Sequence, residues 1–538
     1  MIGTGVEFQI RDNDWQRVYD AAEKAEQQNV RSFCGRDVLI EGGDYIGLWL
    51  ETQPMGGEMY AKRNPVAGMN NQRIFMENIR EDGRLPSVLF LRDGKLDMMF
   101  SHLQGYCFPY HALNMYYWTG RGDRAYLTQL YEVLRRFDEY LWRTRDSDGN
   151  GCLESFCVYD TGEDNSTRFF DAPVMWEKDT PPIGVARLPY ESMDMMGYSI
   201  DGCEALAAIS ALLQNGEEMH WKQKAQSSRD TLRKFLWREE RGACYDRDGN
   251  DQFLDTLIHN NLRVMYHGGF DTYMADRFVR EHLLNPAEFW TPMPLPSLAA
   301  NDPLFRSVGY NNWSGQPQGL TYQRAVRALN NYGYHALVPV LGDKLFGALA
   351  SSEPCVFTQQ FDPFTAKPSE ADGMTNYGPT ILAFLEYTAQ MFGVNPSCGR
   401  IGWGTEGSHG AYIYTQHWGD REYTVENDGK TASLRINGRE IDAVPTGTWV
   451  VTDENGDHRQ RDADAGVPLS AEKRTGRKRW DEDRKACGGV RVSAADRRQC
   501  GGGGSSCGNG GSCTGDAVSG AAENRPDGLC GLPQAPCR

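Results

Sequence analysis

The loop Tyr159–Phe169, with the sequence YDTGEDNSTRF, concentrates groups that could do acid–base chemistry. Asp160, Glu163 and Asp164 supply three carboxylates, and Arg168 supplies a positive charge. A carboxyl that neighbouring aromatic side chains partly remove from water has a raised pKa and can act as a general acid at neutral pH. A solvated polar turn could have the same composition, so the residue types alone leave both interpretations open.

Two further loops combine carboxylates with amides and aromatic rings. They are Trp49–Arg63 (WLETQPMGGEMYAKR) and Phe357–Gly378 (FTQQFDPFTAKPSEADGMTNYG). Their acidic and amide side chains include those of Glu51, Gln53, Glu58, Gln359, Asp362, Glu370 and Asp372. Such loops suit a sugar, because aromatic faces stack on its C–H face while carboxylates and amides accept hydrogen bonds from its hydroxyls.

A fourth loop, Gly309–Pro317 (GYNNWSGQP), places Trp313 before Ser-Gly. Trp313 could form a stacking wall, with the backbone at Gly315 and the amide of Gln316 approaching a ligand. A tryptophan buried at the entry to a helix would give the same pattern, and this alternative stays open.

The elements that must position these loops are helices. Apolar residues recur with helical spacing from about residue 10 to residue 395. The clearest segments are Ala125–Trp142, Gly202–Leu213, Trp221–Trp237, Leu320–Tyr332 and Thr380–Met391. Long loops separate the helical pairs, and long loops inside a compact domain are usually functional. This rhythm predicts a mainly α fold, a barrel of helical hairpins whose long loops gather at one end.

The pattern changes after Ser397. Polar and apolar residues alternate in His409–His417 and in Arg421–Asn427, as in β-strands. The segment Thr431–Ile441 has the pattern of a hairpin with Asn437-Gly438 at its turn. We therefore expect a helical-barrel domain over residues 1–397, a small β-rich appendage over 398–458, and a disordered Gly/Cys-rich tail over 459–538.

Composition excludes several classes of protein. Hydrophobic residues make up 40% of the 538 residues, which is enough to bury a core. A net charge of −17 argues against a nucleic-acid partner. No apolar run approaches the length of a membrane helix, and the N-terminus lacks a secretion signal, so we expect a cytoplasmic protein. The oligomeric state is not predictable.

The tail differs in charge and in cysteine content. Residues 459–538 contain 14 basic and 10 acidic residues and six of the 14 cysteines. Without a CxxC pair or a histidine, the tail lacks the ligand spacing of a zinc site, and a disulfide module would need an oxidising compartment. The loop from Asp146 to Gly151 begins like a calcium loop, but Cys157 stands where a bidentate glutamate is needed. We predict no metal and no cofactor.

Taken in order, the loops resemble the α-glycosidase clan that contains trehalase, processing α-glucosidase and mannosylglycerate hydrolase. The likeness covers about residues 10–395. GEDNSTRF resembles the clan's acid loop, and NNWSGQPQGLTYQRAVRALNNYGY resembles the segment that walls its sugar subsite. The resemblance implies an inverting hydrolase on a six-hairpin (α/α)6 barrel, with Asp164 as the general acid and Arg168 facing the sugar.

One position departs from the clan's pattern. The clan's catalytic base lies in a motif close to E-x-Y-[ND]-P, and the matching stretch here is Gln359-Gln360-Phe361-Asp362-Pro363. An amide cannot activate water at neutral pH. Another carboxylate could serve as the base, with Glu370 as first choice and Asp372, Glu51 and Glu58 as further candidates. Alternatively, the protein is a phosphorylase, whose phosphate nucleophile needs no base, or a sugar-binding protein without activity.

The leading prediction is an inverting glycoside hydrolase that cleaves a small α-linked oligosaccharide or glycoside. The predicted catalytic residues are Asp164 and Glu370. The predicted substrate-binding residues are Trp49, Glu51, Gln53, Glu58, Asn165, Arg168, Trp313, Gly315, Gln316, Gln359 and Asp362.

Overall fold

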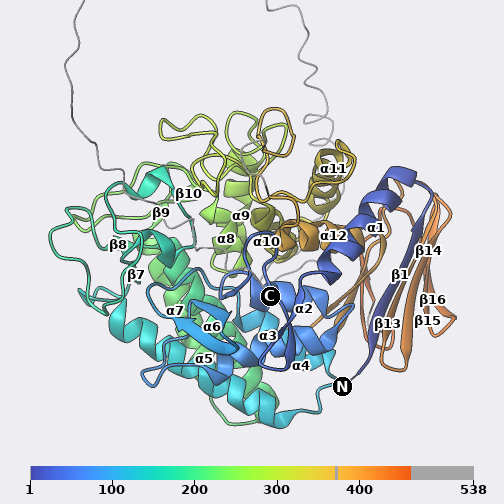
Figure 1. Ribbon diagram of the computed structural model, residues 1–538, viewed down its shortest axis with the longest axis horizontal. Helices are drawn as coiled ribbons and strands as arrows, with labels where there is room; N and C mark the ends of the chain where they lie inside the picture. The colour runs from blue at the N-terminus through green and yellow to red at the C-terminus, as the bar shows by residue number, and fades with distance from the viewer. Residues whose placement is uncertain (1, 370–373, 458, 462–538) are drawn as a thin grey trace, which may run out of the picture. The chain divides into compact units, whose positions relative to one another are not determined.

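A computed structural model describes residues 2–369, 374–457 and 459–461 and is mainly helical (Figure 1). The α-helices of this part of the chain are α1 (Asn13–Gln27), α2 (Gln53–Tyr60), α3 (Pro65–Glu77), α4 (Pro109–Trp118), α5 (Arg124–Thr144), α6 (Met193–Leu213), α7 (Glu218–Phe235), α8 (Asn260–Tyr266), α9 (Thr272–Phe278), α10 (Gly319–Asn330), α11 (Leu337–Ala350) and α12 (Gly378–Phe392). Each of the five segments with clear helical spacing is helical over most of its length, which confirms the mainly α prediction.

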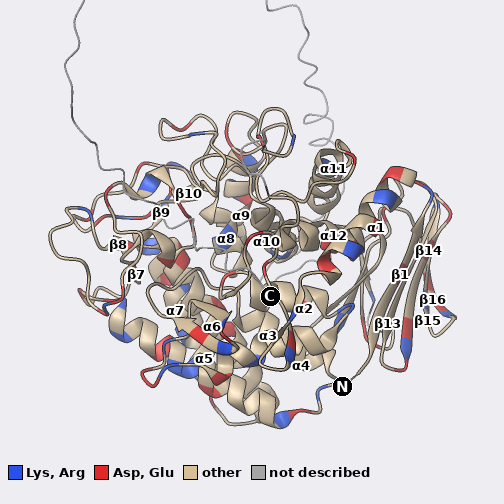
Figure 2. Ribbon diagram, in the orientation of Figure 1, with Lys and Arg blue, Asp and Glu red and all other residues tan. Residues whose placement is uncertain are grey.

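Helix α5 shows how the sequence sets these elements. Asp123 caps its first turn by accepting a hydrogen bond from the Tyr126 amide at 2.9 Å. Its apolar residues, among them Leu130 and Phe137, are buried, and most of its charged residues are at least partly exposed. Asp138 is the exception: it is buried and pairs with Lys224 of α7. Red and blue bands are correspondingly interspersed along α5 in Figure 2. No helix in the described ranges is long and apolar enough to cross a membrane.

Helix packing follows a closed order. Helices α2, α4, α6, α8, α10 and α12 each contact the next of this series, and α12 contacts α2. The other helices pack outside this series: α1 and α11 contact α12, α3 contacts α2 and α4, and α5 and α7 contact α6. Several helices of the series consist almost entirely of buried residues, as expected for helices with neighbours on all sides.

The largest sheet is antiparallel, with the order β1-β13-β14-β15-β16, and lies beside α1 (Figure 1). Its strands are β1 (Thr4–Ile10), β13 (Tyr412–Trp418), β14 (Arg421–Asn427), β15 (Thr431–Ile436) and β16 (Arg439–Pro445). Asn437 and Gly438, with φ of 49° and 75°, form the turn between β15 and β16, which confirms the predicted hairpin. Strand β1 comes from the N-terminus, where no strand was predicted.

A second sheet has the order β11-β12-β17-β18. Its strands are β11 (Val394–Ser397), β12 (Arg400–Trp403), β17 (Val450–Asp453) and β18 (Gln460–Arg461). Residue His409 connects this region to the helices, because its ring bonds Asp12, the cap of α1, at 2.8 Å and Asp343 of α11 at 2.9 Å. The β region and the helices therefore share polar contacts.

The remaining strands are short and lie among the loops between the helices. They are β2 (Val30–Phe33), β3 (Arg36–Leu39), β4 (Leu48–Trp49), β5 (Val88–Arg92), β6 (Lys95–Met99), β7 (Glu154–Ser155), β8 (Tyr190–Glu191), β9 (Trp237–Arg238) and β10 (Ala243–Cys244). Strand β4 leads directly into the loop of Glu51, and β7 and β8 pair at the two ends of the long loop that contains Asp164.

Candidate active site

The loop of Asp164 is held in shape by its own polar residues. The carboxylate of Asp160 accepts hydrogen bonds from the amides of Leu103 and Phe156 at 3.0 and 2.8 Å. Asp160 is fully buried, so its role is to fix the backbone that precedes Asp164. Asn165, with φ of 58°, turns the chain and donates its side-chain N–H to the Asn311 carbonyl at 3.0 Å.

Asp164 is half-buried, and its two carboxyl oxygens differ. Oδ2 accepts a hydrogen bond from the Asn311 side-chain amide, whereas the buried Oδ1 has no hydrogen-bond partner within the described residues. Burial and the negative charges of Glu51 and Glu163 raise the pKa of Asp164 to about 8, although the Asn311 bond opposes this rise. Asp164 therefore carries a proton at neutral pH.

Asn311 connects this loop to the segment that includes Gln359. Its Oδ1 accepts from Trp313 Nε1 at 3.1 Å and from Gln359 Nε2 at 2.8 Å. The Tyr45 hydroxyl in turn donates to Gln359 Oε1 at 3.1 Å. Gln359 and Asp164, which the sequence assigned to the base position and to the acid, are thus joined through a residue that sequence reasoning missed.

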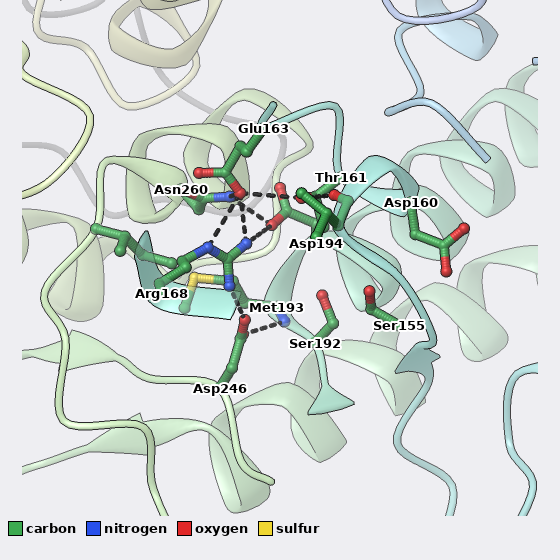
Figure 3. A network of polar contacts seen from close by, with 12 residues as sticks. Ser155, Asp160, Thr161, Glu163, Arg168, Ser192, Met193, Asp194, Asp246 and Asn260 are labelled. Atoms are coloured by element: carbon green, nitrogen blue, oxygen red, sulfur yellow. Dashed lines mark hydrogen bonds and ion pairs between the residues drawn. The ribbon is translucent and has the colours of Figure 1, made fainter. Parts of the chain in front are cut away.

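Arg168 lies in a buried network of carboxylates (Figure 3). Its guanidinium pairs with Glu163, with Asp246 at 2.7 Å and with Asp194 at 3.8 Å. Burial would raise the pKa of Glu163, but the positive charges of Arg168 and Arg263 outweigh it and lower the pKa to about 2. The side chain predicted to face a sugar therefore anchors the Asp164 loop to the start of α6 and to the segment after β10.

Glu51 lies directly beneath the same loop. A Cβ atom at Gly162 would clash with Glu51 Oε2, so only glycine permits this approach. Glu51 Oε1 pairs with Arg324 at 2.5 Å and lies 3.7 Å from Arg263 Nη2. Arg263 also donates to the Thr161 carbonyl at 2.6 Å. Glu51 and the two buried arginines, Arg263 and Arg324, therefore form a buried ionic cluster against the loop that contains Asp164.

The other predicted residues of the Glu51 loop have local partners. Gln53 Oε1 accepts from the Trp49 amide at 3.4 Å, and the Trp49 ring, half-buried, contacts Tyr45 edge-to-face at 5.4 Å. Glu58 accepts from Asn114 and Trp118 at 2.7 and 2.8 Å and bonds His111 at 3.0 Å. Burial would raise the pKa of Glu58, but these hydrogen bonds and nearby positive charges lower it. Glu58 belongs to a separate, structural cluster.

Trp313 is 2% exposed, and its ring stacks on His259 at 5.6 Å between centroids. The backbone N–H of Trp313 donates to the Asp164 carbonyl at 3.0 Å, so Trp313 helps to hold the backbone of the loop that contains Asp164. Gly315 allows a close backbone approach, since a Cβ there would clash with the Arg306 carbonyl. Gln316 donates to Ser307 at 3.4 Å, and its buried Oε1 has no partner among the described residues.

Asp362 shapes the turn that follows Gln359. It accepts hydrogen bonds from the amides of Phe364 and Thr365 at 3.0 and 2.7 Å. Burial would raise the pKa of Asp362, but these bonds lower it. The predicted base Glu370, like Asp372, lies outside the described residues.

The structure adds one carboxyl that the sequence did not single out. Glu41, 6% exposed, accepts a hydrogen bond from Thr52 Oγ1 at 3.2 Å. Burial and the charges of Glu51 and Asp164 raise the pKa of Glu41 to about 8, against the effect of its hydrogen bonds. Glu41 is therefore close enough to Asp164 to interact with it electrostatically.

Comparison with known families identifies the family to which the chain belongs. Residues 63–378, which include Asp164, Arg168 and Gln359, match the model of the mannosylglycerate hydrolase MGH1-like glycoside hydrolase domain. The chain belongs to this glycoside hydrolase family. It is a member of the six-hairpin glycosidase clan expected from the sequence. A search of curated proteins found no sequence match.

Solved structures with low identity share the fold of this glycoside hydrolase. A mannosylglycerate hydrolase from Thermus thermophilus, in complex with glucose, has 15% identity and a TM-score of 0.56, covering 68% of this chain and 100% of its own. A sialidase has 14% identity and a TM-score of 0.64, covering 84% of this chain and 42% of its own. An α-L-rhamnosidase from Dictyoglumus thermophilum has 11% identity and a TM-score of 0.52, covering 83% of this chain and 45% of its own.

In this glycoside hydrolase, sequence reasoning missed Asn311, Tyr45 and Glu41. Asn311 lies within a loop that the sequence did single out, two residues before Trp313, and its neighbouring asparagine was the available signal. Glu41 and Tyr45 precede the predicted loop, and only their position in space relates them to Asp164.

Proposed function

We propose that the protein is an inverting α-glycosidase that cleaves a small α-linked oligosaccharide or glycoside with Asp164 as the general acid. The observation that carries this proposal is the state of Asp164. Its raised pKa keeps a proton on the carboxyl at neutral pH, and its Oδ1 is the oxygen without a partner in the described part of the chain. A protonated carboxyl with one uncommitted oxygen is what a glycosidic leaving group requires.

We also propose that the helices form an (α/α)6 barrel. The closed order of contacts through α2, α4, α6, α8, α10 and α12 supports an inner ring, with the other helices outside it. The division into residues 1–397, 398–458 and 459–538 belongs to the same proposal. The loops of Glu41, Asp164, Asn311 and Gln359 meet at one place, as loops at one end of such a barrel would.

An inverting enzyme needs a base about 6.5–9.5 Å from the acid, with water between them. Glu370 remains our first choice, because it follows Gln359 in the same segment. Glu41 is the structural alternative, because the charge of Asp164 contributes to its raised pKa. Two carboxyls that disfavour each other's charge pass through a singly protonated state, with one acid and one base. Glu51 is a weaker candidate for the base because its carboxylate is paired with Arg324. Glu58 is also a weaker candidate, because its carboxylate is hydrogen-bonded to His111, Asn114 and Trp118.

For the substrate, we propose that a sugar contacts Asn165, Gln316, Trp49 and Glu51 around Asp164. Because one structural neighbour is a mannosylglycerate hydrolase from Thermus thermophilus, we include mannosylglycerate among the substrates to be tested. The site would be shaped by four further predicted residues through the contacts described above: Gln53, Gly315, Gln359 and Asp362. The buried side chains of Arg168 and Trp313 would stabilise the loop that carries Asp164.

The test is a panel of aryl α-glycosides, α-linked disaccharides and α-mannosylglycerate, followed by proton NMR. We expect the β-anomer as the first-formed sugar, and a rate that falls as pH rises through about 8, because Asp164 then loses its proton. First release of the α-anomer would refute inversion. Release of a sugar 1-phosphate only in the presence of phosphate would favour a phosphorylase, and binding without release would favour a binding protein.

A further inference from the structure

Gln359 occupies the position of the clan's base, yet its contacts show a defined task. The side chain is 3% exposed and hydrogen-bonded at both ends of its amide. Oε1 accepts from the Tyr45 hydroxyl at 3.1 Å, and Nε2 donates to Asn311 Oδ1 at 2.8 Å. An amide supplies one acceptor and one donor group, as these two contacts demand, whereas a carboxylate supplies only acceptors.

The orientation of the Asn311 amide is fixed by a group that can only donate. The indole Nε1–H of Trp313 lies 3.1 Å from one end of this amide, which must therefore be the oxygen. Gln359 Nε2 donates to the same oxygen. The opposite end, the NH2 group, consequently faces Asp164 Oδ2 and donates to it. Turning the amide around would leave the buried indole N–H without an acceptor, which is costly.

This orientation decides where the proton of Asp164 resides. Oδ2 accepts from the Asn311 NH2 group, so a neutral Asp164 carries its proton on Oδ1. Oδ1 is the oxygen without a partner within the described residues. The chain Tyr45–Gln359–Asn311 therefore directs the transferable proton to Oδ1, the carboxyl oxygen that makes no hydrogen bond within the described residues.

We infer that Gln359 is a positioning residue for the general acid, acting through Asn311, and does not take the place of a catalytic base. This inference rests on the proposed glycosidase function. An ionised glutamate at position 359 would place a carboxylate oxygen against Asn311 Oδ1, where two acceptors would face each other. The amide at this position is thus matched to Asn311 and Trp313, and the base must come from another residue.

The test compares Gln359→Glu and Gln359→Met on two kinds of substrate. Aryl glycosides with poor leaving groups need the acid, whereas glycosyl fluorides need little protonation and depend on the base. For Gln359→Met we expect kcat on the poor leaving group to fall by up to about 10²-fold, the scale of a misplaced catalytic group, with fluoride turnover far less affected. Gln359→Glu should also lose activity on the poor leaving group.

The pH profile supplies a readout that a loss of packing would not move. The new charge in Gln359→Glu should shift the basic limb of kcat to higher pH, because it disfavours ionisation of Asp164. Gln360→Met is the matched control. Gln360 is equally buried and bonds the same loop through backbone groups: it donates to the Asn312 carbonyl at 3.0 Å and to the Val308 carbonyl at 3.3 Å, and it accepts from the Asn312 amide at 3.3 Å. We expect this control to lower thermal stability and leave the basic limb in place.

Two results would overturn the inference. A rise of kcat in Gln359→Glu on both substrates would mean that the position restores a base, and loss of fluoride turnover in Gln359→Met would mean that Gln359 itself orients the attacking water. If the wild type cleaves no glycoside, the proposed function fails separately. The inference is then tested by carbon NMR titration of Asp164, assigned with Asp164→Asn. Identical titration in the wild type and Gln359→Met would refute it.

Discussion

Replacement of Arg168 by methionine should destabilise the protein far more than it weakens sugar binding. Arg168 is 2% exposed and holds Glu163 and Asp246 by direct ion pairs, with Asp194 at 3.8 Å. Removing one partner of a buried ion pair costs about 3–5 kcal/mol, because the remaining charge stays buried without compensation. Methionine keeps much of the side-chain volume, so the expected loss of about 3–5 kcal/mol reflects charge more than a cavity.

The loss should depend on pH. In the wild type, the pKa of Glu163 is lowered to about 2, so its ionised form contributes stability above the pKa of the unfolded chain and loses it as pH falls. In Arg168→Met the stranded carboxyls take up protons instead. The difference in stability between the two proteins should therefore be largest near neutral pH and should narrow on acidification.

Urea unfolding followed by tryptophan fluorescence at several pH values measures this difference. Arg187→Met is the matched control, since Arg187 belongs to the same long loop but is exposed, over the ring of the half-exposed Phe170. It should change stability by less than about 0.5 kcal/mol. An unchanged urea midpoint in Arg168→Met, together with a raised KM, would refute the anchoring role and restore the predicted contact with the sugar.

Three further outcomes are expected. Glu370→Gln should abolish turnover of glycosyl fluorides while Glu41→Gln retains it, and the opposite result would make Glu41 the base. His409→Gln should lower the free energy of unfolding by about 1 kcal/mol at acidic pH and by less as pH rises. Burial would lower the pKa of His409, but the two aspartates outweigh it and raise this pKa, so the stabilising charge is lost as pH rises. A loss of thermal stability that does not depend on pH would contradict this prediction. Truncation after Arg461 should keep the melting temperature and activity, whereas truncation after Asp457 removes β18 and should lower the melting temperature; equal melting temperatures would show that β18 is dispensable.

Local patterns in the sequence predicted the helices and the hairpin because each depends on neighbouring residues. The apolar spacing of α5 and the Asn437-Gly438 turn are complete within short segments. Strand β1 was missed because its partner β13 lies about 400 residues away, and register between such distant strands leaves no local trace. The expected division into three parts stays a prediction.

The site was predictable where chemistry is concentrated in one loop. Asp164 could be found from the density of polar residues around it and from its resemblance to an acid loop. Its partner Asn311 lies 147 residues away, and the bond between them exists only in the folded chain. Arg168 and Trp313 illustrate the reverse case: residue type suggested contact with a sugar, and their burial and partners, which the sequence does not show, are the basis for the proposal that they support the loop.

The most direct test of the account is Asp164→Asn, which removes the transferable proton and keeps the size of the side chain. Turnover of glycosides with poor leaving groups should fall by about 10²–10⁴-fold, and turnover of glycosyl fluorides should fall far less. Asp171→Asn, an exposed carboxylate on the same loop, should leave both rates unchanged. Unimpaired turnover of every substrate by Asp164→Asn would contradict the assignment of Asp164 as the general acid.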